Sequence, residues 1–447
     1  MITKENIEYI VDDIIFFDTT EKYESFKIES DENKIKLSID GNSYQEPVFN
    51  IDKIILLNED IELLEFIRSS VLKIESLYSD EYKNFYSKDI NKYTANFLKL
   101  IHFFSNEHYL KTEIVLDNHQ RIITTQVENI YLKFLEIPIT DILINFFLAR
   151  LKIRPSVKKK IYFTCDFDTL NMWDVVGLKG LLHKVIKSIL KFNFKQLSQE
   201  LLSFLFSRNS IKYNYFLNSK MFVAQKEMPQ NGNISIKNIA FWLVSYQNNI
   251  YDVDNNFSRK NVKQFIGDLK KLEVINGIHP NYDTIKSTNS LEKQIQKFQS
   301  IFNHLPNHSR FHYLRSNFPN SLIILADNAI KNDFTYCFSD SLLFRGGRTK
   351  PIKLWDNIHK KPIDIVSIPI TIMDGTLTDY MKLNYQEALS LCKRKIFFSF
   401  TFGSSCSLLW HNHIMYEFGI ENNYHPILFE EIKKYLFQLI NQTQTTN

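Results

Sequence analysis

The feature that most constrains the fold of this chain is an alternation of short β-prone runs with longer helical patterns, which starts near Ile161. The β-prone runs are residues 161–164, 220–224, 363–372, 395–402 and 407–410, and the helical patterns are residues 178–206, 290–302 and 427–440. Such alternation is typical of βα units, whose strands align in parallel. We therefore predict an α/β fold with a largely parallel sheet.

The first 150 residues are less regular and predict a separate domain. Residues 34–39 alternate apolar and polar side chains, as a half-buried strand does. Asn58 is a candidate N-cap for a helix that continues to Ile74, and residues 97–104 and 142–148 predict further core helices. We predict an α/β N-terminal domain of unknown role over residues 1–154, a larger α/β domain over residues 155–425, and a C-terminal helix with a polar tail over residues 426–447.

Composition excludes several classes of protein. The chain has 447 residues, 44% hydrophobic and 23% charged, so it can bury a core, and its net charge of 54 − 50 = +4 is too balanced for nucleic-acid binding. Four cysteines without a Cys-x-x-Cys pair indicate a reducing compartment. Acidic residues near the N-terminus argue against a signal peptide, and the longest apolar stretch, residues 142–149, is too short to span a bilayer. We therefore expect a cytoplasmic protein with no transmembrane segment.

The segment Thr164-Cys165-Asp166-Phe167-Asp168 is the strongest candidate for chemistry. Its two carboxylates follow a buried strand, and parallel α/β folds place their sites at the carboxyl ends of strands. Residues two apart share one face of an extended backbone, so both carboxylates could enter one pocket. One could bind a divalent cation while the other acts as a base toward water. The alternative is that both acids cap the next helix or satisfy a turn.

His279 is the first histidine candidate. It follows Gly277 in a chain with only 11 glycines, which predicts a backbone bend that presents the imidazole. Asp283 comes four residues after His279, a spacing at which both could bind one metal if a helical turn follows Pro280. The alternative is an ordinary loop histidine at the surface.

Three more histidines, His304, His308 and His312, recur at intervals of four, the spacing of a metal-binding helix face. Pro306 would disrupt a helix there, so we interpret His304 and His308 as loop residues. Arg310 and His312 remain candidates, because residues two apart in extended backbone point the same way.

Two further segments are weaker candidates. His411 ends an apolar strand beside Trp410 and could act as a general acid. The run 345–348, Arg-Gly-Gly-Arg, either binds an anionic or hydroxylated ligand or forms a tight turn with exposed arginines. Residues 251–254 repeat the spaced acid pair, but the asparagines around them indicate a polar loop, and we exclude them.

The order of these motifs carries more information than any one of them. A strand ending in Thr-x-Asp-x-Asp, then Gly-x-His-Pro, Ser-Arg-x-His-Tyr-Leu, Phe-Arg-Gly and Leu-Trp-His-Asn resembles the polysaccharide deacetylase (NodB-type) superfamily, over roughly residues 157–419. More narrowly, the chain looks like the bacterial branch with an additional N-terminal domain. The resemblance implies a distorted (β/α) barrel over residues 155–425, with a metal site at the carboxyl ends of its strands.

The resemblance also implies roles for individual residues. Asp166 would be the general base, Asp168 the metal-binding carboxylate and His279 a metal-binding histidine. Arg310 would orient the base, and His411 would protonate the leaving amine. The implied reaction is hydrolysis of a C–N amide in an acetylated sugar or oligosaccharide, with a divalent metal, zinc by preference, as cofactor.

Two departures from the family pattern bear on these roles. Phe167 separates the two aspartates, which are adjacent in the family, and this could exchange their roles. Asp283 stands where the family has a second histidine, so a site of Asp168, His279 and Asp283 would be richer in oxygen and could favour another metal. The alternative function is a degenerate barrel that binds a glycan or a partner in surface-polysaccharide biosynthesis without catalysis, through exposed aromatics and Arg345 and Arg348.

Overall fold

The computed structural model describes most of the chain from Asn96 to Gln444 and shorter stretches before it. The described residues are 9, 11, 26–30, 34–39, 42–47, 56–74, 85, 96–153, 158–222, 232–245, 250–284, 288–356, 359, 361–415 and 423–444. No helix among them is long and apolar enough to cross a membrane. All four cysteines are buried free thiols.

Eight strands in this part of the chain form one sheet, in which every neighbouring pair is parallel, in the order β11-β8-β7-β6-β5-β4-β13-β12. Their bounds are β4 Lys159–Phe167, β5 Ile234–Leu243, β6 Ile275–His279, β7 His308–Ser309, β8 Asn332–Asp333, β11 Val366–Ser367, β12 Ile372–Met373 and β13 Ser405–His411. The prediction of an α/β fold with a parallel sheet is confirmed.

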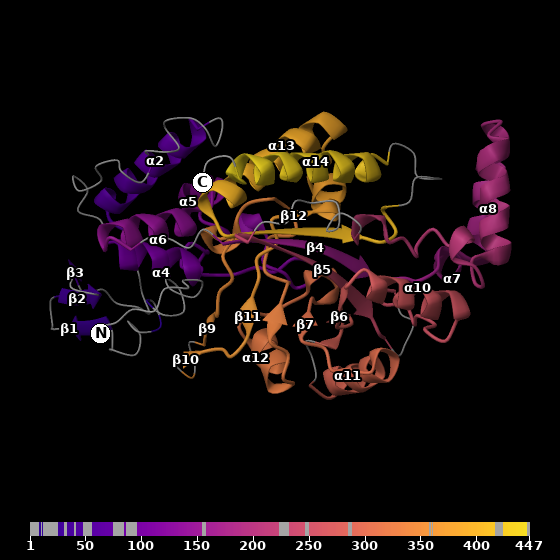
Figure 1. Ribbon diagram of the computed structural model, residues 1–447, viewed down its shortest axis with the longest axis horizontal. Coiled ribbons are helices and arrows are strands. Elements are labelled where there is room, and N and C mark those ends of the chain that lie inside the picture. Colours follow the sequence, from indigo (N-terminus) through magenta and orange to yellow (C-terminus); the bar gives the residue numbers. More distant parts are fainter. Residues whose placement is uncertain are drawn as a thin grey trace.

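The two edge strands require the sheet to curl. β11 ends at Ser367 and β12 begins at Ile372, so only four residues join opposite edges of the sheet. The five Cα–Cα steps from Ser367 to Ile372 span at most roughly 18 Å. Eight strands laid flat would put the edges about 33 Å apart, since neighbouring strands lie about 4.8 Å apart. The sheet therefore curls into an incomplete barrel, as Figure 1 shows.

Helices cover the sheet on both sides (Figure 1). Helices α13 and α14 lie on one side, while α10, α11 and α12 lie on the other, and α7 and α8 stand at one end of the molecule. The bounds are α7 Met172–Leu190, α8 Phe194–Phe206, α10 Lys260–Lys271, α11 Thr288–Phe302, α12 Asn320–Asp327, α13 Tyr385–Phe402 and α14 His425–Gln444. The predicted helical patterns at 178–206, 290–302 and 427–440 are confirmed, the first as two helices.

Three predicted strands need correction. Residues 220–222 are helical, and the strand in this region is β5, which begins at Ile234. Residues 363–372 contain only β11 and the start of β12. Residues 395–402 form the last two turns of α13. Every residue of that last run is buried, and a helix buried on all sides has no polar face to distinguish it from a strand.

The N-terminal region contains a small antiparallel sheet and several helices. Its bounds are β1 Phe26–Ser30, β2 Lys34–Ile39, β3 Asn42–Pro47, α2 Asn58–Leu72, α4 Phe97–Ser105, α5 Asn129–Leu132 and α6 Ile139–Arg150. The predicted strand at 34–39 and the three predicted helices are confirmed. The N-cap of α2 is Leu57 and not Asn58, and the Asp60 carboxylate accepts its N–H at 2.8 Å.

The predicted domain boundary at residues 154–156 lies outside the described residues. On either side of it the chain packs into one continuous hydrophobic core. Asn145 on α6 donates to the carbonyl oxygen of Phe402 at 3.0 Å, and Lys395 on α13 donates to that of Glu136 at 2.8 Å. The remaining short strands, β9 Trp355–Asp356 and β10 Lys361–Pro362, form an antiparallel pair.

Candidate active site

The site is built at the carboxyl ends of the central strands. Asp166 lies in β4 opposite His411 of β13, and Asp168 follows the last residue of β4. His279 is the last residue of β6, and His312 comes three residues after β7. Parallel strands end at one edge of a sheet, so residues far apart in sequence meet there. We call Asp166, Asp168, His279, His312 and His411 the acid–histidine cluster.

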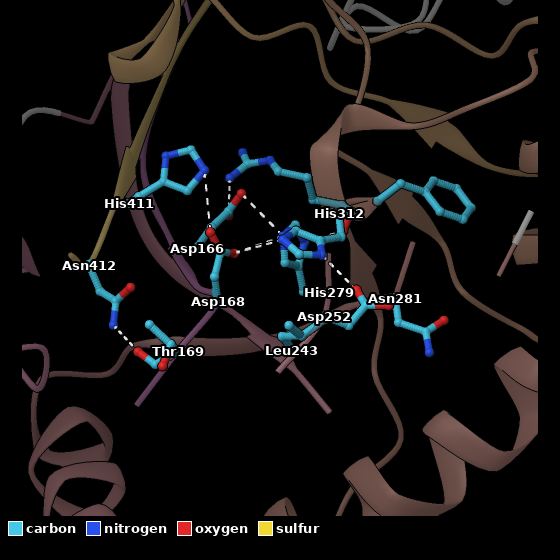
Figure 2. Close-up of polar contacts among 12 residues, drawn as sticks. Asp166, Asp168, Thr169, Leu243, Asp252, His279, Asn281, His312, His411 and Asn412 are labelled. Carbon is cyan, nitrogen blue, oxygen red and sulfur yellow. Dashed lines mark hydrogen bonds and ion pairs between the residues drawn. The ribbon is translucent and has the colours of Figure 1, made fainter. Parts of the chain in front are cut away.

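Three imidazoles point toward the Asp168 carboxylate (Figure 2). The Nε2 atoms of His279 and His312 lie 3.2 and 3.7 Å from Oδ1 of Asp168. Nε2 of His411 lies 3.8 Å from Oδ2. The imidazoles outweigh the effect of burial, which alone would raise the pKa of Asp168, and together they hold it well below its usual value.

Each imidazole is oriented through its other ring nitrogen. Nδ1 of His279 contacts the carbonyl oxygen of Arg310. Nδ1 of His312 lies 2.7 Å from Oδ1 of Asp252, and Nδ1 of His411 lies 2.7 Å from Oδ1 of Asp374. These acceptors favour a proton on Nδ1, which leaves the Nε2 lone pair of His279 and His312 available for a metal.

Asp168, His279 and His312 fit a divalent cation. One ligand atom from each lies within 4.8 Å of the others. Oδ1 of Asp168 and Nε2 of His279 are buried and have no hydrogen-bond partner among the described residues. Leaving two such atoms unpaired costs about 1–3 kcal/mol each, a penalty that metal coordination removes. One carboxylate and two imidazoles are a ligand set that zinc accepts while keeping an open position.

Asp166 is held by Arg310. The guanidinium Nη1 donates to Oδ1 of Asp166 at 2.6 Å, and Nη2 donates to the Thr164 hydroxyl at 2.7 Å. Nε donates to the carbonyl oxygen of Phe334 at 2.9 Å, and the guanidinium lies over the Phe241 ring at 4.4 Å. Arg310 is fully buried, so these contacts fix both its position and that of the carboxylate it binds.

His411 is an imidazole that keeps its proton. Burial alone would lower its pKa, but the carboxylates of Asp374 and Asp168 outweigh burial and raise it to about 10. The pKa of Asp374 is in turn lowered, because the charge and hydrogen bonds of His411 outweigh the effect of burial. His411 therefore carries a transferable proton at neutral pH.

A cavity of about 130 Å³ opens beside the cluster. Asp166 and His411 line it together with Arg121, Tyr313 and Tyr380. Arg121 precedes Asn129 of α5 in the N-terminal region and donates to the Tyr380 hydroxyl at 2.7 Å and to the carbonyl oxygen of Tyr313 at 3.1 Å. The N-terminal region thus supplies part of the wall of this cavity.

The structure brings five of the six predicted site residues together: Asp166, Asp168, His279, Arg310 and His411. Asp283 lies apart from them, with its side chain 53% exposed and its Oδ1 3.4 Å from Nη1 of Arg315. The third metal-compatible position beside Asp168 and His279 is occupied by His312.

The predicted role of Gly277 is wrong. It does not form a bend, because it lies inside β6. A Cβ atom there would lie 2.7 Å from the Phe241 ring and 3.0 Å from the carbonyl oxygen of His308. Gly277 therefore allows β6 to pack closely behind the cluster.

The predicted tight turn is confirmed at Arg345–Gly347, with Gly346 and Gly347 at positive φ, but its arginines are not exposed. Arg345 and Arg348 are buried, so the turn does not form a ligand surface either. Arg345 contacts both carboxylate oxygens of Glu107, and Arg348 Nε lies 3.9 Å from Oδ1 of Asp141. Both arginines join the N-terminal region to the larger α/β unit.

Two residues of the site, Asp252 and Asp374, are not among the candidates that the sequence predicts. Asp252 was excluded as part of a polar loop, yet its buried carboxylate binds His312 and also accepts the N–H of Tyr282 at 3.0 Å. Asp374 directly follows β12, so the rule that singled out Asp166, an acid at a strand end, could have found it. No comparable local signal marks Asp252.

No protein-family model matches the chain, and no curated protein matches it significantly. Among solved structures, the chain is similar to the "putative polysaccharide deacetylase from Mycobacterium smegmatis", with 11% identity and a TM-score of 0.36. The match covers 64% of this chain and 85% of the other. At this level of similarity the geometry of the site, and not the neighbour, carries the functional argument.

Proposed function

We propose that the chain is a metal-dependent hydrolase that removes an acetyl group from an amino sugar or a polysaccharide precursor. The observation that carries this proposal is the convergence of His279, His312 and His411 on Asp168, beside an Asp166 carboxylate fixed by Arg310. The order of sequence motifs, which resembles that of polysaccharide deacetylases, supports the choice of substrate class.

Asp168, His279 and His312 would hold a divalent cation, and zinc suits this ligand set. When bound, the cation supplies Lewis acidity that polarises an amide carbonyl and lowers the pKa of water. Nδ1 of His279 and of His312 each faces an oxygen acceptor, which increases the basicity of the ligand nitrogens.

Asp166 is the proposed general base. Its Oδ1 accepts a hydrogen bond from Arg310. Its Oδ2 lies 3.7 Å from Nε2 of His279, so this second oxygen faces the proposed metal-binding residues. From this position Asp166 would take a proton from the attacking water. Arg310 would keep the carboxylate oriented without entering the reaction itself.

His411 is the proposed general acid on the other side of the cavity. Asp374 holds its Nδ1, and its Nε2 carries the proton that the leaving amine nitrogen needs. A base and an acid on two sides of one cavity match the requirements of amide hydrolysis, in which water loses a proton and the amine gains one.

The non-catalytic alternative was motivated by Asp283 in place of a histidine and by the arginine turn. His312 occupies a metal-compatible position that Asp283 does not reach, and Arg345 and Arg348 are buried against acidic residues. Both observations support the catalytic proposal over the binding-only one.

The test measures acetate released from N-acetylated glucosamine oligomers by the purified chain, before and after chelation and after addition of zinc. We expect release by the untreated protein, loss of activity on chelation and recovery with metal. A protein that releases no acetate in any of these states, and binds the same oligomers equally well after chelation, would favour the binding-only alternative.

A further inference from the structure

Helices α7 and α8 form a hairpin that projects from one end of the molecule (Figure 1). Residues 191–193 join α7 to α8. Near its start α7 breaks at Gly177, whose φ of +56° suits glycine. The arrow of β4 points toward this end of the molecule, and α7 begins four residues after Asp168.

Polar side chains take part in the contact between the two helices, beside the packed rings of Trp173 and Phe204. Ser188 donates to Oε2 of Glu200 at 3.1 Å, and the indole N–H of Trp173 donates to the Ser203 hydroxyl at 2.9 Å. Glu200, Ser188 and Ser203 are all buried. The hairpin therefore buries paired polar groups together with the apolar side chains of Trp173 and Leu181.

The outward faces are correspondingly apolar. Of the 25 large hydrophobic side chains exposed among the described residues, 13 belong to this hairpin. They are Val175, Val176, Leu178, Leu182, Ile186, Ile189, Leu190, Phe192, Phe194, Leu201, Leu202, Leu205 and Phe206. Exposed apolar side chains at this density mark an interaction surface.

The tip of the hairpin is the most exposed part of this surface. Leu190, Phe192 and Phe194 are 73%, 82% and 66% exposed. Phe192 has a φ of +52°, at the position after a helix where glycine is the usual residue. A phenylalanine there bears conformational strain of about 1 kcal/mol, and its side chain remains mostly exposed.

The hairpin is also basic. Residues 172–206 contain five lysines (179, 184, 187, 191 and 195) and two acids, a net charge of 5 − 2 = +3. The two acids contribute little negative charge to the exposed surface of the hairpin, because Asp174 pairs with Arg208 and Arg259 and Glu200 is buried between the helices. Apolar side chains at the tip are thus flanked by lysines, with Lys191 and Lys195 on either side of Phe192 and Phe194.

We propose that the α7–α8 hairpin docks onto the surface of an anionic phospholipid bilayer. Basic amphipathic helices bind there by inserting apolar side chains while lysines contact anionic headgroups. A second copy of the chain fits less well, because association would bring two surfaces of net charge +3 together and the cores of protein interfaces are depleted in lysine. Docking would turn toward the membrane the end of the molecule to which β4 points (Figure 1).

This proposal does not depend on the deacetylase activity, and one flotation experiment tests it. The full chain is mixed with vesicles of phosphatidylcholine alone or of phosphatidylcholine and phosphatidylglycerol in equal amounts. We expect at least about tenfold tighter binding to the anionic vesicles, since each lysine near an anionic surface strengthens binding about fivefold. Binding should weaken as salt is added.

Two double variants separate the apolar and the charged contributions. Phe192→Ser with Phe194→Ser should weaken binding to anionic vesicles by at least about tenfold. Lys191→Gln with Lys195→Gln should weaken binding to anionic vesicles by about twenty-five-fold, about fivefold for each lysine, and leave binding to neutral vesicles unchanged. Ile427→Ser, which alters an exposed apolar residue on α14, is the matched control and should bind as the unaltered chain does. Unchanged circular dichroism establishes that each variant folds.

Two results would overturn the proposal. One is a chain that does not bind anionic vesicles, or binds them equally well with both phenylalanines replaced. The other is a dimer in sedimentation velocity that the two phenylalanine substitutions dissociate, which would assign the hairpin to a second copy. Acetate release measured in parallel reports on the active site alone, so failure of either proposal is recognised separately.

Discussion

Proteins usually expose charged side chains and bury large apolar ones, and the acid–histidine cluster and the α7–α8 hairpin depart from this rule in opposite ways. The cluster buries charged side chains, and the hairpin exposes apolar ones. In the cluster almost every charged group has a partner from another strand end, such as Arg310 for Asp166 and Asp374 for His411. On the hairpin the buried polar groups between the helices are likewise paired within the chain, while the large apolar side chains are exposed.

In the cluster, other groups of the same chain compensate the buried charges, whereas the apolar side chains of the hairpin remain exposed to the surroundings. Burying charges is expensive without compensating charges, and the ends of five strands, β4, β6, β7, β12 and β13, supply them at the cluster. Exposing thirteen large apolar side chains is also unfavourable, and the described residues leave them 36–82% exposed. Substitutions in the two regions should therefore change different measurements.

The largest effect is expected at the proposed base. Asp166→Asn removes the group that accepts the proton of water, and kcat/KM for acetate release should fall by about a thousandfold. Metal content and vesicle binding should be unchanged, because Asp168 and the hairpin are intact. Asp268→Asn, at an exposed acid on α10, is the control. A rate within a few-fold of the unaltered protein would remove Asp166 from the mechanism.

The next effect is a shift of the pH profile. Asp374 helps to raise the pKa of His411 to about 10, so the imidazole loses its proton only as the pH rises through that value. In Asp374→Asn this pKa should fall toward the usual value of about 6.5, and the alkaline limb of kcat should move to lower pH. At pH 7 a pKa of about 6.5 leaves roughly a quarter of the imidazoles protonated, so kcat should drop by about fourfold, with a smaller loss under more acidic conditions. An alkaline limb that stays in place would contradict the role of His411.

The residues in these two predictions also show how much of the site can be predicted from the sequence. Asp166, Asp168 and His411 follow or end strands that the sequence predicts, so this local signal is visible in the sequence. His279 ends β6 and Arg310 follows β7, two strands that the sequence does not predict, and they are singled out by their place in the order of motifs. The partners Asp252 and Asp374 were not identified, because their pairing with His312 and His411 depends on which strands become neighbours in the curled sheet. The position of Asp283 beside Arg315 also depends on the tertiary fold, and its spacing from His279 does not predict it. Residues 395–402 were misread as a strand because burial on all sides hides the helical period.

A smaller effect is expected from the packing behind the cluster. In Gly277→Ala the new Cβ would meet the Phe241 ring and the carbonyl oxygen of His308, so the free energy of unfolding should fall by about 1–3 kcal/mol. Gly267→Ala is the matched control: this residue lies in α10 with no atom within 4 Å of an added Cβ, and the change should stabilise by about 0.5–1 kcal/mol. Urea unfolding measures both, and equal effects would mean that β6 tolerates a side chain at Gly277.

The smallest effect on stability should come from the exposed side of the hairpin. Leu182→Ser removes an apolar side chain that is 55% exposed, so the free energy of unfolding should change by only about 0.5 kcal/mol. Acetate release from a soluble substrate should be unaffected. A loss of several kcal/mol in the same urea titration would mean that the hairpin is part of the core, and the contrast between the two regions would fail.

The central claim is that Asp168, His279 and His312 hold a divalent metal that serves hydrolysis. The most direct test is the metal content of the purified chain, measured by atomic emission, in His312→Ala and in Asp283→Ala. We predict about one divalent ion per chain in the unaltered protein and in Asp283→Ala, and loss of both metal and acetate release in His312→Ala. Metal retained without His312, or lost without Asp283, would contradict the account.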